Sequence, residues 1–264
     1  MELKLVGMTN GRSPVLAGRT ALVTGAAGGI GAAISRRLSE DGASVIAADR
    51  DKETLRSLAE EIGAAPLVVD LSDIDALPAA VDQVAGSVDI LVNNAGTQHV
   101  APIQDFPIET FELITRLMLT APFVLARAVV PAMYRHGWGR LVHISSAHGR
   151  RASPFKVAYV SAKHGLEGLS KVLALEGAGH GVTSNCVNPG YVRTPLVEKQ
   201  IADQAEAHHL AREEVLDQVM LASSPIKRLV EPPEVAAAVA YLCGPGSDSI
   251  TGSDLVIDGG WGAR

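Results

Sequence analysis

A tyrosine placed between two lysines at helical spacing is the clearest chemical signal in this sequence. Lys156, Tyr159 and Lys163 are separated by three and four residues, which puts them on one face of a predicted helix. A phenol normally loses its proton near pH ~10, too high for a base at neutral pH. An ammonium group within ~4–6 Å favours the phenolate. We therefore predict that Tyr159 is a general base whose pKa is lowered by Lys163.

A serine and a histidine upstream of this helix fit the same chemistry. Ser146 lies thirteen residues before Tyr159 and offers a hydroxyl that orients and stabilises a substrate oxygen. His148 and Lys156 add a second donor and a positive charge, which a substrate carboxylate needs because burying an unpaired carboxylate is costly. This set predicts oxidation of a hydroxy acid by loss of a proton and a hydride. The alternative is that these residues have no catalytic or binding role: Tyr159 and Lys163 would form an exposed surface pair, Lys156 would be an exposed lysine, and His148 a solvated loop residue.

A glycine-rich turn near the N-terminus predicts a dinucleotide site. Gly25, Gly29 and Gly31 follow the first apolar run and open a helix, where backbone amides and the positive helix end can meet a pyrophosphate. Asp49 ends the second apolar run, where a carboxylate accepts the ribose hydroxyls of NAD and repels the 2′-phosphate of NADP. The predicted cofactor is therefore NAD. Arg50, the next residue, could instead reach a phosphate.

Two further residues each have two open interpretations. Asp70 ends the third apolar run, where it could bind the adenine amine of the cofactor or cap the helix that follows. Thr194 comes shortly after Pro189 and Gly190, where it could hold the nicotinamide carboxamide or cap the next helix. The sequence leaves both alternatives open.

Short apolar runs alternate with helical patterns through most of the chain. This alternation predicts right-handed crossovers and a single-domain, Rossmann-like α/β fold, a doubly wound parallel sheet of about seven strands. The expected strands lie in RTALVTG, ASVIAAD, APLVVDLS, VDILVNNAG, GRLVHISS, GVTSNCVNPG and GSDLVIDGG. The expected helices are Ile30–Asp41, Lys52–Ile62, Ile74–Ala85, Phe106–His136, Ala158–Gly179 and Pro233–Cys243.

Two segments fall outside this regular alternation. Residues 1–18 show no sustained period and predict an N-terminal arm before one domain of residues 19–264. Residues 195–225 form a long, charged, helix-prone insertion between the sixth and seventh predicted strands. Because open α/β sheets bind ligands at the carboxyl ends of their strands, we predict that this insertion is a lid over the site. The alternative is an exposed helical pair without a gating role.

Composition restricts the class of protein further. The 264 residues carry 29 acidic and 23 basic side chains, and the net charge of -6 argues against nucleic acid as a partner. Cys186 and Cys243 have no ligand-like spacing, which indicates free thiols, a reducing compartment and no metal site. The N-terminus lacks the apolar core of a signal peptide. The most apolar run, at 120–133, is too short for a membrane span and contains Arg127, so we expect no membrane partner. We expect a cytoplasmic protein that acts on a small molecule.

These motifs together resemble the short-chain dehydrogenase/reductase family. The matching segments are TGAAGGIG from Thr24 to Gly31, NNAG from Asn93 to Gly96, Ser146, the Tyr159/Lys163 pair and Pro189–Gly190. The resemblance implies Ser146, Tyr159 and Lys163 as catalytic residues. The cofactor-binding residues that it implies are Thr24, Gly25, Gly29, Ile30, Gly31, Asp49, Asp70, Asn94, Ala95, Gly96, Tyr159, Lys163, Pro189, Gly190, Val192 and Thr194.

Within the family, several segments resemble the bacterial D-3-hydroxybutyrate dehydrogenases: NNAGTQHV, SSAHG, SPFKVAYVSAKHG, NPGYVRTPLVEKQIA and VIDGGWGAR. This similarity implies NAD-dependent oxidation of D-3-hydroxybutyrate, or of a similar short 3-hydroxy acid, to acetoacetate, a reaction of ketone-body metabolism. The substrate-binding residues that it implies are Gln98, Ser146, His148, Lys156, Tyr159, Tyr191 and Gln200, with Tyr191 where the subgroup has tryptophan. It also implies a homotetramer built through the two longest helices and the last strand.

One position departs from the family pattern. Met118, in the segment RLMLTAPF, occupies the place of an asparagine that is thought to hold a water linking the catalytic lysine to solvent. A thioether is a weak acceptor and donates nothing. One hypothesis is an active enzyme whose water relay is held by other groups, and another is an NAD-binding regulatory protein without turnover. A short-chain reductase of 3-oxoacyl thioesters or sugars is the remaining alternative.

Overall fold

The computed structural model describes residues 14–195, 197–198, 201, 205 and 210–263 and is built on a seven-stranded parallel sheet. The strands follow the order β3–β2–β1–β4–β5–β6–β7, so the chain reverses direction across the sheet between β3 and β4. The strands are β1 (Thr20–Thr24), β2 (Ser44–Asp49), β3 (Ala65–Val68), β4 (Ile90–Asn93), β5 (Gly139–Ile144), β6 (Val182–Pro189) and β7 (Asp254–Ile257). All seven lie in the segments predicted as strands, which confirms the doubly wound α/β fold.

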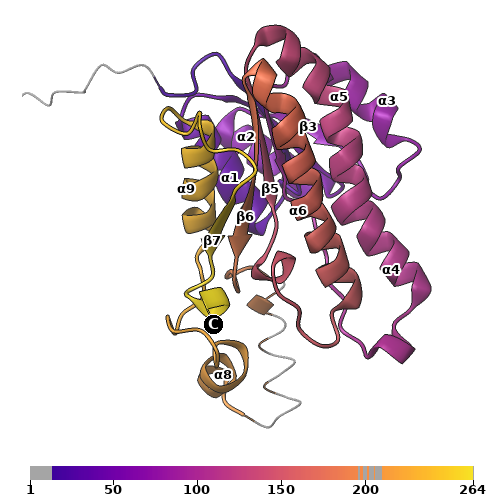
Figure 1. Ribbon diagram of the computed structural model, residues 1–264, viewed down its shortest axis with the longest axis vertical. Helices are drawn as coiled ribbons and strands as arrows, with labels where there is room; N and C mark the ends of the chain where they lie inside the picture. The colour runs from indigo at the N-terminus through magenta and orange to yellow at the C-terminus, as the bar shows by residue number, and fades with distance from the viewer. Residues whose placement is uncertain (1–13, 196, 199–200, 202–204, 206–209, 264) are drawn as a thin grey trace, which may run out of the picture.

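Helices cover both faces of the sheet (Figure 1). They are α1 (Gly29–Glu40), α2 (Lys52–Ile62), α3 (Leu77–Ala85), α4 (Ile108–Thr115), α5 (Ala121–His136), α6 (Val157–Gly177), α8 (Arg212–Glu214) and α9 (Pro232–Cys243). Local chemistry sets several ends. Asp51 caps α2 by accepting a hydrogen bond from the backbone of Thr54, and Gly63 ends it in the left-handed region with φ of 68°. Helix α3 begins at Leu77, later than the predicted Ile74, with proline in its first turn.

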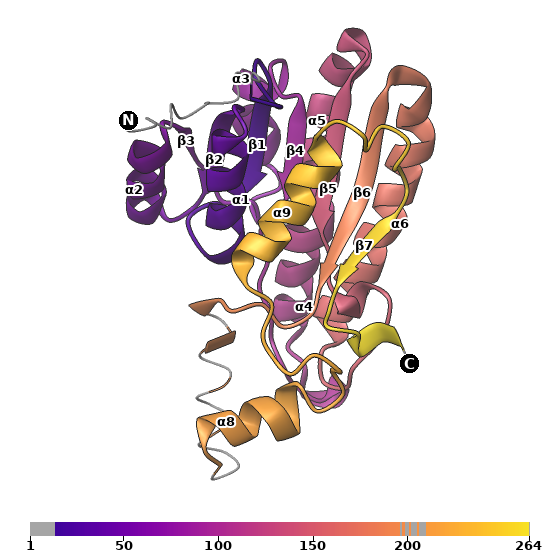
Figure 2. The same cartoon turned by 90° about the vertical axis from the view of Figure 1, so that its left-hand side faces the viewer.

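Alternating strand residues feed two separate apolar cores. On β1, Ala21 and Val23 pack under α1, α2 and α9, whereas Leu22 between them packs under α3 and α5. This two-sided burial is what a parallel sheet with crossover helices requires. Figure 2 shows α1 and α9 lying together on one face of the sheet. Leu16 belongs to the first core and donates its amide to the Asp41 carbonyl, so this part of the predicted N-terminal arm is packed. Residues 1–13 lie outside the described part of the chain.

The longest helical stretch runs without interruption from α4 through a π-helical segment, η2 (Arg116–Thr120), into α5. Among the described residues, this 29-residue stretch is long and apolar enough to cross a membrane by length and composition, and an 18-residue window within it has a mean hydropathy of 1.7. The helix is nearly as long as the predicted Phe106–His136, and the short apolar run at 120–133 is only part of it. Leu125, Val129 and Met133 nevertheless pack in the core beneath the sheet, so this helix is a covering layer.

The insertion after β6 lies at the carboxyl end of the sheet, where Figures 1 and 2 place α8 below the strand tips. Helix α8 continues into a π-helical segment, η5 (Val215–Met220). The described residues of the insertion form a small apolar core of their own, in which Ile201, Val215 and Met220 are buried and Tyr191 packs against them. The insertion therefore contacts the edge of the sheet at which ligands bind in open α/β folds.

Candidate active site

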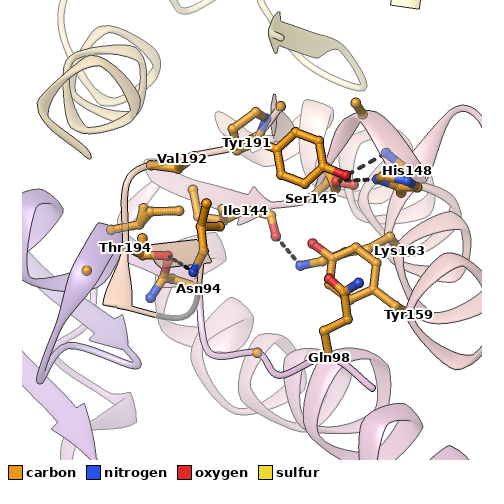
Figure 3. Close-up of a pocket in the computed structure, with 18 of the residues that line it drawn as sticks. Asn94, Gln98, Ile144, Ser145, His148, Tyr159, Lys163, Tyr191, Val192 and Thr194 are labelled. Atoms are coloured by element: carbon orange, nitrogen blue, oxygen red, sulfur yellow. Dashed lines mark hydrogen bonds between the residues drawn. The ribbon is translucent and has the colours of Figure 1, made fainter. Parts of the chain in front are cut away.

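A cavity of about 640 Å³ opens at the carboxyl ends of the central strands. Its walls come from the glycine-rich turn after β1, the NNAG segment after β4, the end of β5, the start of α6, the loop after β6 and the insertion (Figure 3). Parallel strands bring these segments to one edge of the sheet even though they are far apart in the sequence. Most of the site residues predicted from the sequence thus lie around one cavity.

The N-terminus of α1 forms one end of the cavity. Gly25, Gly29 and Ile30 line it, as does Gly28, a residue that sequence reasoning did not single out. Gly28 is the N-cap, and its helix has no side-chain cap, so the first-turn amides have no capping partner. A Cβ on Gly28 would meet nothing within 4 Å. Open space in front of uncapped helix amides fits the pyrophosphate of a dinucleotide.

Asp49, at the end of β2, is held by the backbone beside this turn. One carboxylate oxygen accepts a hydrogen bond of 3.0 Å from the amide of Ala27, and the other accepts one of 3.1 Å from the amide of Asp51. Asp49 also lines the cavity, so its remaining lone pairs are available to ribose hydroxyls. Arg50 is exposed next to it. These residues fit the adenosine end of a nicotinamide dinucleotide.

Three residues with an implied cofactor contact are placed elsewhere. Thr24 accepts hydrogen bonds from the amides of Asn94 and Ala95 and ties the two loops together beneath the cavity. A Cβ on Gly31 would lie 2.1 Å from the Gly25 carbonyl oxygen, so that glycine permits close packing. Asp70 accepts hydrogen bonds from the backbone and side chain of Ser72 after β3, hydrogen bonds that lower its pKa. Asp70 therefore stabilises a turn and does not cap the following helix, because the N-cap of α3 is Ala76.

The remaining implied cofactor residues lie along the cavity wall. They are Asn94, Ala95 and Gly96 from the NNAG segment, and Pro189, Gly190, Val192 and Thr194 from the loop after β6. The hydroxyl of Thr194 also accepts a hydrogen bond of 3.4 Å from the amide of Val197. Thr194 thus caps the following segment while it faces the cavity, so the two interpretations of this residue are compatible.

Ser146, Tyr159 and Lys163 all line the cavity. Figure 3 shows Tyr159 and Lys163 next to each other. Ser146 follows the end of β5, and its hydroxyl accepts a hydrogen bond of 3.1 Å from the amide of His148. Lys163 is only 4% exposed and donates a hydrogen bond of 2.6 Å to the Ile144 carbonyl. Its Nζ lies 5.6 Å from the centre of the Tyr159 ring. The arrangement places a phenol, a hydroxyl donor and an ammonium group around one position.

The pKa of Tyr159 differs from the sequence expectation. Burial raises the pKa of the phenol above its ordinary value, and a hydrogen bond with Ser146 opposes this increase only in part. The predicted lowering by Lys163 is therefore wrong for the protein alone. Loss of hydration acts on the whole phenol, whereas the Lys163 ammonium is directed to the Ile144 carbonyl.

Burial of Lys163 has a measurable effect on stability. It lowers the pKa of the ammonium from 10.5 to about 8, against the opposing charges of Cys186 and Glu167. The unfolded chain then binds more protons than the folded one between about pH 8 and 10.5, so the free energy of unfolding rises with pH through that window. We expect Lys163→Met to lose this rise, which amounts to roughly 3 kcal/mol. Urea unfolding of both proteins at several pH values measures this rise. If the free energy of unfolding changes equally with pH in both proteins, the prediction is contradicted.

The opposite end of the cavity holds the implied substrate residues. Gln98, His148, Lys156 and Tyr191 all line it, whereas Gln200 lies outside the described residues. Lys156 donates a hydrogen bond of 3.4 Å to the Tyr191 hydroxyl. The Gln98 Nε2 atom is buried and has no hydrogen-bond partner among the described residues. A cation and an unpaired amide donor at one end of a cavity form a site for a small anion.

His148 is a neutral member of this group at neutral pH. Burial lowers the pKa of its imidazole to about 4, and the positive charges of Lys156 and His164 add to the effect. Its Nε2 is hydrogen-bonded to the Ser153 hydroxyl at 2.9 Å, and its ring lies 5.4 Å from that of Trp261. Lys156 is therefore the group that supplies the positive charge, and His148 contributes polar contacts.

Comparisons with known proteins agree with this geometry. The family profile described as enoyl-(acyl carrier protein) reductase matches residues 25–262. The D-beta-hydroxybutyrate dehydrogenases of Rhizobium meliloti (strain 1021) and Cupriavidus necator are 43% and 38% identical, over 93% and 95% of this chain and 99% and 100% of theirs. The chain belongs to the short-chain dehydrogenase/reductase family. The crystal structure of L-sorbose reductase from Gluconobacter frateurii, complexed with NADPH and L-sorbose, is similar with a TM-score of 0.88, at 30% identity over 96% of this chain and 100% of that one.

Membership of the short-chain dehydrogenase/reductase family makes the protein an oxidoreductase of hydroxy or oxo substrates, with a small molecule as substrate. NAD or NADP is the cofactor typical of this family, and the glycines at the α1 end of the cavity fit the pyrophosphate that both contain. The activity falls in the class of oxidoreductases that act on alcohols with a nicotinamide acceptor. The family and the fold predicted from the sequence are both confirmed.

Met118, where the short-chain dehydrogenase/reductase pattern has asparagine, lies in the π-helical segment η2. It is 1% exposed and packs with Ala158 and Ala162 of α6, with Tyr159 against the same cluster. A Cβ on Gly96 would lie 3.4 Å from its methyl carbon, so the thioether fills the space between the NNAG segment and α6. An apolar side chain thus closes the region behind the phenol.

Several cavity residues were missed by sequence reasoning. Ser153 and Trp261 contact His148, and Met220 reaches the cavity from the insertion. The segments SPFKVAYVSAKHG and VIDGGWGAR contain two of them, but a lone serine or tryptophan has no spacing that signals a contact. Met220 lies in a charged, helix-prone stretch, where a single methionine has no spacing that signals a cavity contact.

Proposed function

We propose that the chain is an NAD-dependent dehydrogenase that oxidises D-3-hydroxybutyrate, or a similar short 3-hydroxy acid, to the 3-oxo acid. The observation that carries the proposal is a cation and an unpartnered amide donor that line the same cavity as the reactive trio. Lys156 and Gln98 line the same cavity as Ser146 and Tyr159, and the Gln98 amide nitrogen lacks a partner among the described residues. A neutral alcohol needs no such charge, whereas a carboxylate does. Two relatives named D-beta-hydroxybutyrate dehydrogenase support the choice.

Each residue of the trio has a distinct task in this reaction. Tyr159 accepts the proton of the substrate hydroxyl, and Ser146 donates a hydrogen bond to the same oxygen as negative charge develops on it. Lys163 keeps a positive charge near the phenol. Bound NAD would accept the hydride at its nicotinamide ring, which also carries positive charge. Lys156 and Gln98 hold the carboxylate, so the carbon that loses hydride is fixed relative to the trio.

A direct assay tests this proposal. The purified protein with NAD and D-3-hydroxybutyrate should produce the reduced nicotinamide, and acetoacetate should be reduced faster than its ethyl ester. The ester has the same ketone but no free carboxylate, so it leaves Lys156 without a partner. Faster reduction of the ester, or of a 3-oxoacyl thioester, would favour another short-chain reductase. Clear NAD binding without turnover would favour a regulatory protein whose Met118 has removed the water relay.

The cofactor preference rests on Asp49. We expect Asp49→Asn to lower kcat/KM with NAD by about 10-fold or more, because hydrogen bonds to a charged group contribute about 1.5–3 kcal/mol. The same variant should gain activity with NADP, since the repulsion of the 2′-phosphate is removed. Asp51→Asn is the matched control, because Asp51 is a nearby exposed acid that caps α2. Steady-state kinetics with both cofactors measure the ratio. An unchanged ratio contradicts the NAD assignment, as would a parent protein that prefers NADP.

We further propose a cytoplasmic homotetramer with the insertion as a lid. Exposed apolar side chains on the two longest helical stretches support the assembly, among them Ile108, Phe123 and Leu175 at 73%, 49% and 82% exposure. Such side chains on one monomer are typical of surfaces that pair with another copy. The lid is supported by Met220, which contacts both the cavity and the core of the insertion.

A further inference from the structure

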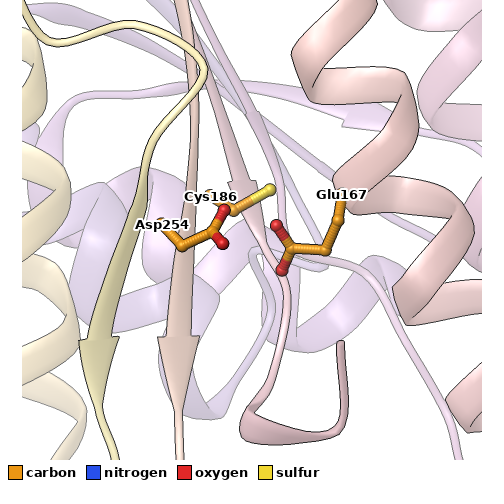
Figure 4. A group of neighbouring side chains, drawn as sticks. All are labelled: Glu167, Cys186 and Asp254. Atoms are coloured by element: carbon orange, nitrogen blue, oxygen red, sulfur yellow. The ribbon is translucent and has the colours of Figure 1, made fainter. Parts of the chain in front are cut away.

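Two carboxylic acids lie close together behind the reactive trio, Glu167 buried and Asp254 partly exposed. Glu167 on α6 and Asp254 on β7 point toward each other, with Cys186 of β6 beside them (Figure 4). One oxygen of each acid and the sulfur all lie within 4.8 Å of one another. Glu167 is 4% exposed and Cys186 is fully buried. Asp254 is partly exposed, and its carboxylate also lies 3.6 Å from the Arg150 guanidinium. Because Glu167 is buried, two carboxylates this close do not both ionise without a penalty, and we expect them to share one proton.

Glu167 is connected to the catalytic serine through one side chain. The Nδ2 atom of Asn188, which is fully buried, donates a hydrogen bond of 2.6 Å to Glu167 and one of 3.1 Å to the Ser146 carbonyl. Ser146 lies just beyond the end of β5, where the ladder no longer holds the backbone. The Asn188 amide therefore holds the backbone of Ser146 in place, and the hydrogen bond to the Glu167 carboxylate holds the amide in its orientation.

Glu167 is also connected to the catalytic lysine. It follows Lys163 by four residues on α6, so the two side chains lie on the same helical face. Burial weakens the ammonium form of Lys163, and the charge of Glu167 opposes this effect. The carboxylate thus stabilises the protonation state that a cation beside Tyr159 requires.

We propose that Glu167 is a positioning residue of the active site: it shares one proton with Asp254, holds Ser146 through Asn188 and supplies the negative charge that faces Lys163. Sequence reasoning did not single out Glu167 or Asp254, and neither lines the cavity. The proposal concerns how the trio is held and not which hydroxy acid reacts. It depends on the proposed function only for the assay substrate.

The charged neighbours agree with one shared proton. Burial raises the pKa of Asp254 to about 6, and Glu167 adds to this rise by its hydrogen bond and charge. Burial alone would raise the pKa of Glu167 as well, but its polar neighbours, among them Asp254 and the Asn188 amide that donates to it, bring the pKa below its ordinary value. The proton therefore resides on Asp254. The other titratable groups that face the pair are Lys163 and Lys171 on α6, Arg150 after β5, His143 on β5 and Cys186 on β6.

Two substitutions separate the hydrogen bond from the charge. Glu167→Leu keeps the volume but removes both, so kcat for D-3-hydroxybutyrate oxidation should fall about 10-fold at an unchanged KM. Glu167→Gln is expected to recover most of that loss, because its amide oxygen accepts from Asn188 and its amide nitrogen donates to Asp254. It still lacks the charge, so the alkaline limb of kcat/KM, near pH 8 in the parent, should move down by about one unit.

Glu176→Gln is the matched control, because Glu176 is an exposed acid on the same helix. It should leave kcat and the pH profile unchanged. Equal kcat in the parent and Glu167→Leu would overturn the link to Ser146. An unmoved alkaline limb in Glu167→Gln would overturn the link to Lys163.

A stability measurement tests the shared proton without any substrate. The folded protein keeps a proton on Asp254 up to about pH 6, whereas the unfolded chain releases it near 3.8. The free energy of unfolding from this pair therefore falls as pH rises from about 4 to 6. Asp254→Asn and Glu167→Gln should both lose this fall. If the free energy of unfolding depends on pH identically in all three proteins, the shared proton is overturned. It is also overturned if the purified parent contains one zinc ion per chain and Glu167→Gln contains none. If the parent shows no turnover but both variants lose the fall in stability, the proposed function is wrong and the shared proton between Glu167 and Asp254 is still supported.

Discussion

Tyr159→Phe is expected to lower kcat for D-3-hydroxybutyrate oxidation by about 10²–10⁴-fold, the usual contribution of a general base. The substitution removes the hydroxyl that receives the substrate proton and keeps the ring that packs against Met118 and Ala162. Ser146 has no basic group with which to replace it. The formation of reduced nicotinamide under saturating NAD and substrate measures the change.

NAD binding separates this outcome from a folding defect. The dissociation constant for NAD should change little in Tyr159→Phe, because the glycine-rich turn and Asp49 hold the adenosine half. Tyr241→Phe is the matched control, since Tyr241 is 52% exposed on α9 and takes no part in the cavity. A Tyr159→Phe protein that turns over as fast as the parent would remove the phenol from the mechanism.

Lys156→Met should raise the KM for D-3-hydroxybutyrate by about 10²-fold, because truncating one partner of a buried charge pair costs about 2–5 kcal/mol. Methionine keeps the length and the apolar stem, so the pocket loses only its positive charge. Reduction of ethyl acetoacetate, which has no carboxylate, should be almost unaffected. Initial rates over a range of both substrates provide the comparison.

The matched control for that prediction is Lys171→Met, an exposed lysine on the same helix. Its KM values should equal those of the parent. If Lys156→Met affects the free acid and the ester equally, the lysine supports the shape of the pocket and the hydroxy-acid assignment loses its main support.

Much of the fold follows directly from the sequence. Residues such as Leu22 and Val23 lie in short apolar runs between helical patterns. A run that is apolar on both sides is typical of a parallel strand buried on both faces of the sheet. The glycines after β1 and the carboxylate of Asp49 could be assigned because each occupies the end of a strand, and all parallel strands end at the same edge. Spacing along the chain therefore determines position in space for these residues.

Other features depend on contacts that spacing does not determine. Lys156 was predicted on the helix of Tyr159, but α6 begins at Val157 because Pro154 and Phe155, the latter with φ of 68°, turn the backbone just before it. Periodicity cannot detect a backbone turn of that kind. The rise in the pKa of Tyr159 reflects how much water the folded chain removes, which is a property of the whole site.

The Glu167–Asp254 pair shows the same limit in another way. Each acid looks like an ordinary surface residue in the sequence, one within a helical pattern and one in a short final strand. Their proximity arises only when α6 packs beside β6 and β7 joins the sheet. Pairings of this type require the tertiary fold.

Tyr191 contributes to both the apolar core of the insertion and the wall of the cavity. Its ring packs against the apolar core of the insertion, and its hydroxyl accepts the hydrogen bond from Lys156 inside the cavity. A molecule that fixes this ring therefore also favours the packing of Ile201, Val215 and Met220 around it, and by thermodynamic reciprocity that packing strengthens the binding of the molecule. Resistance of the insertion to a protease should thus report occupancy, even with a ligand that cannot react.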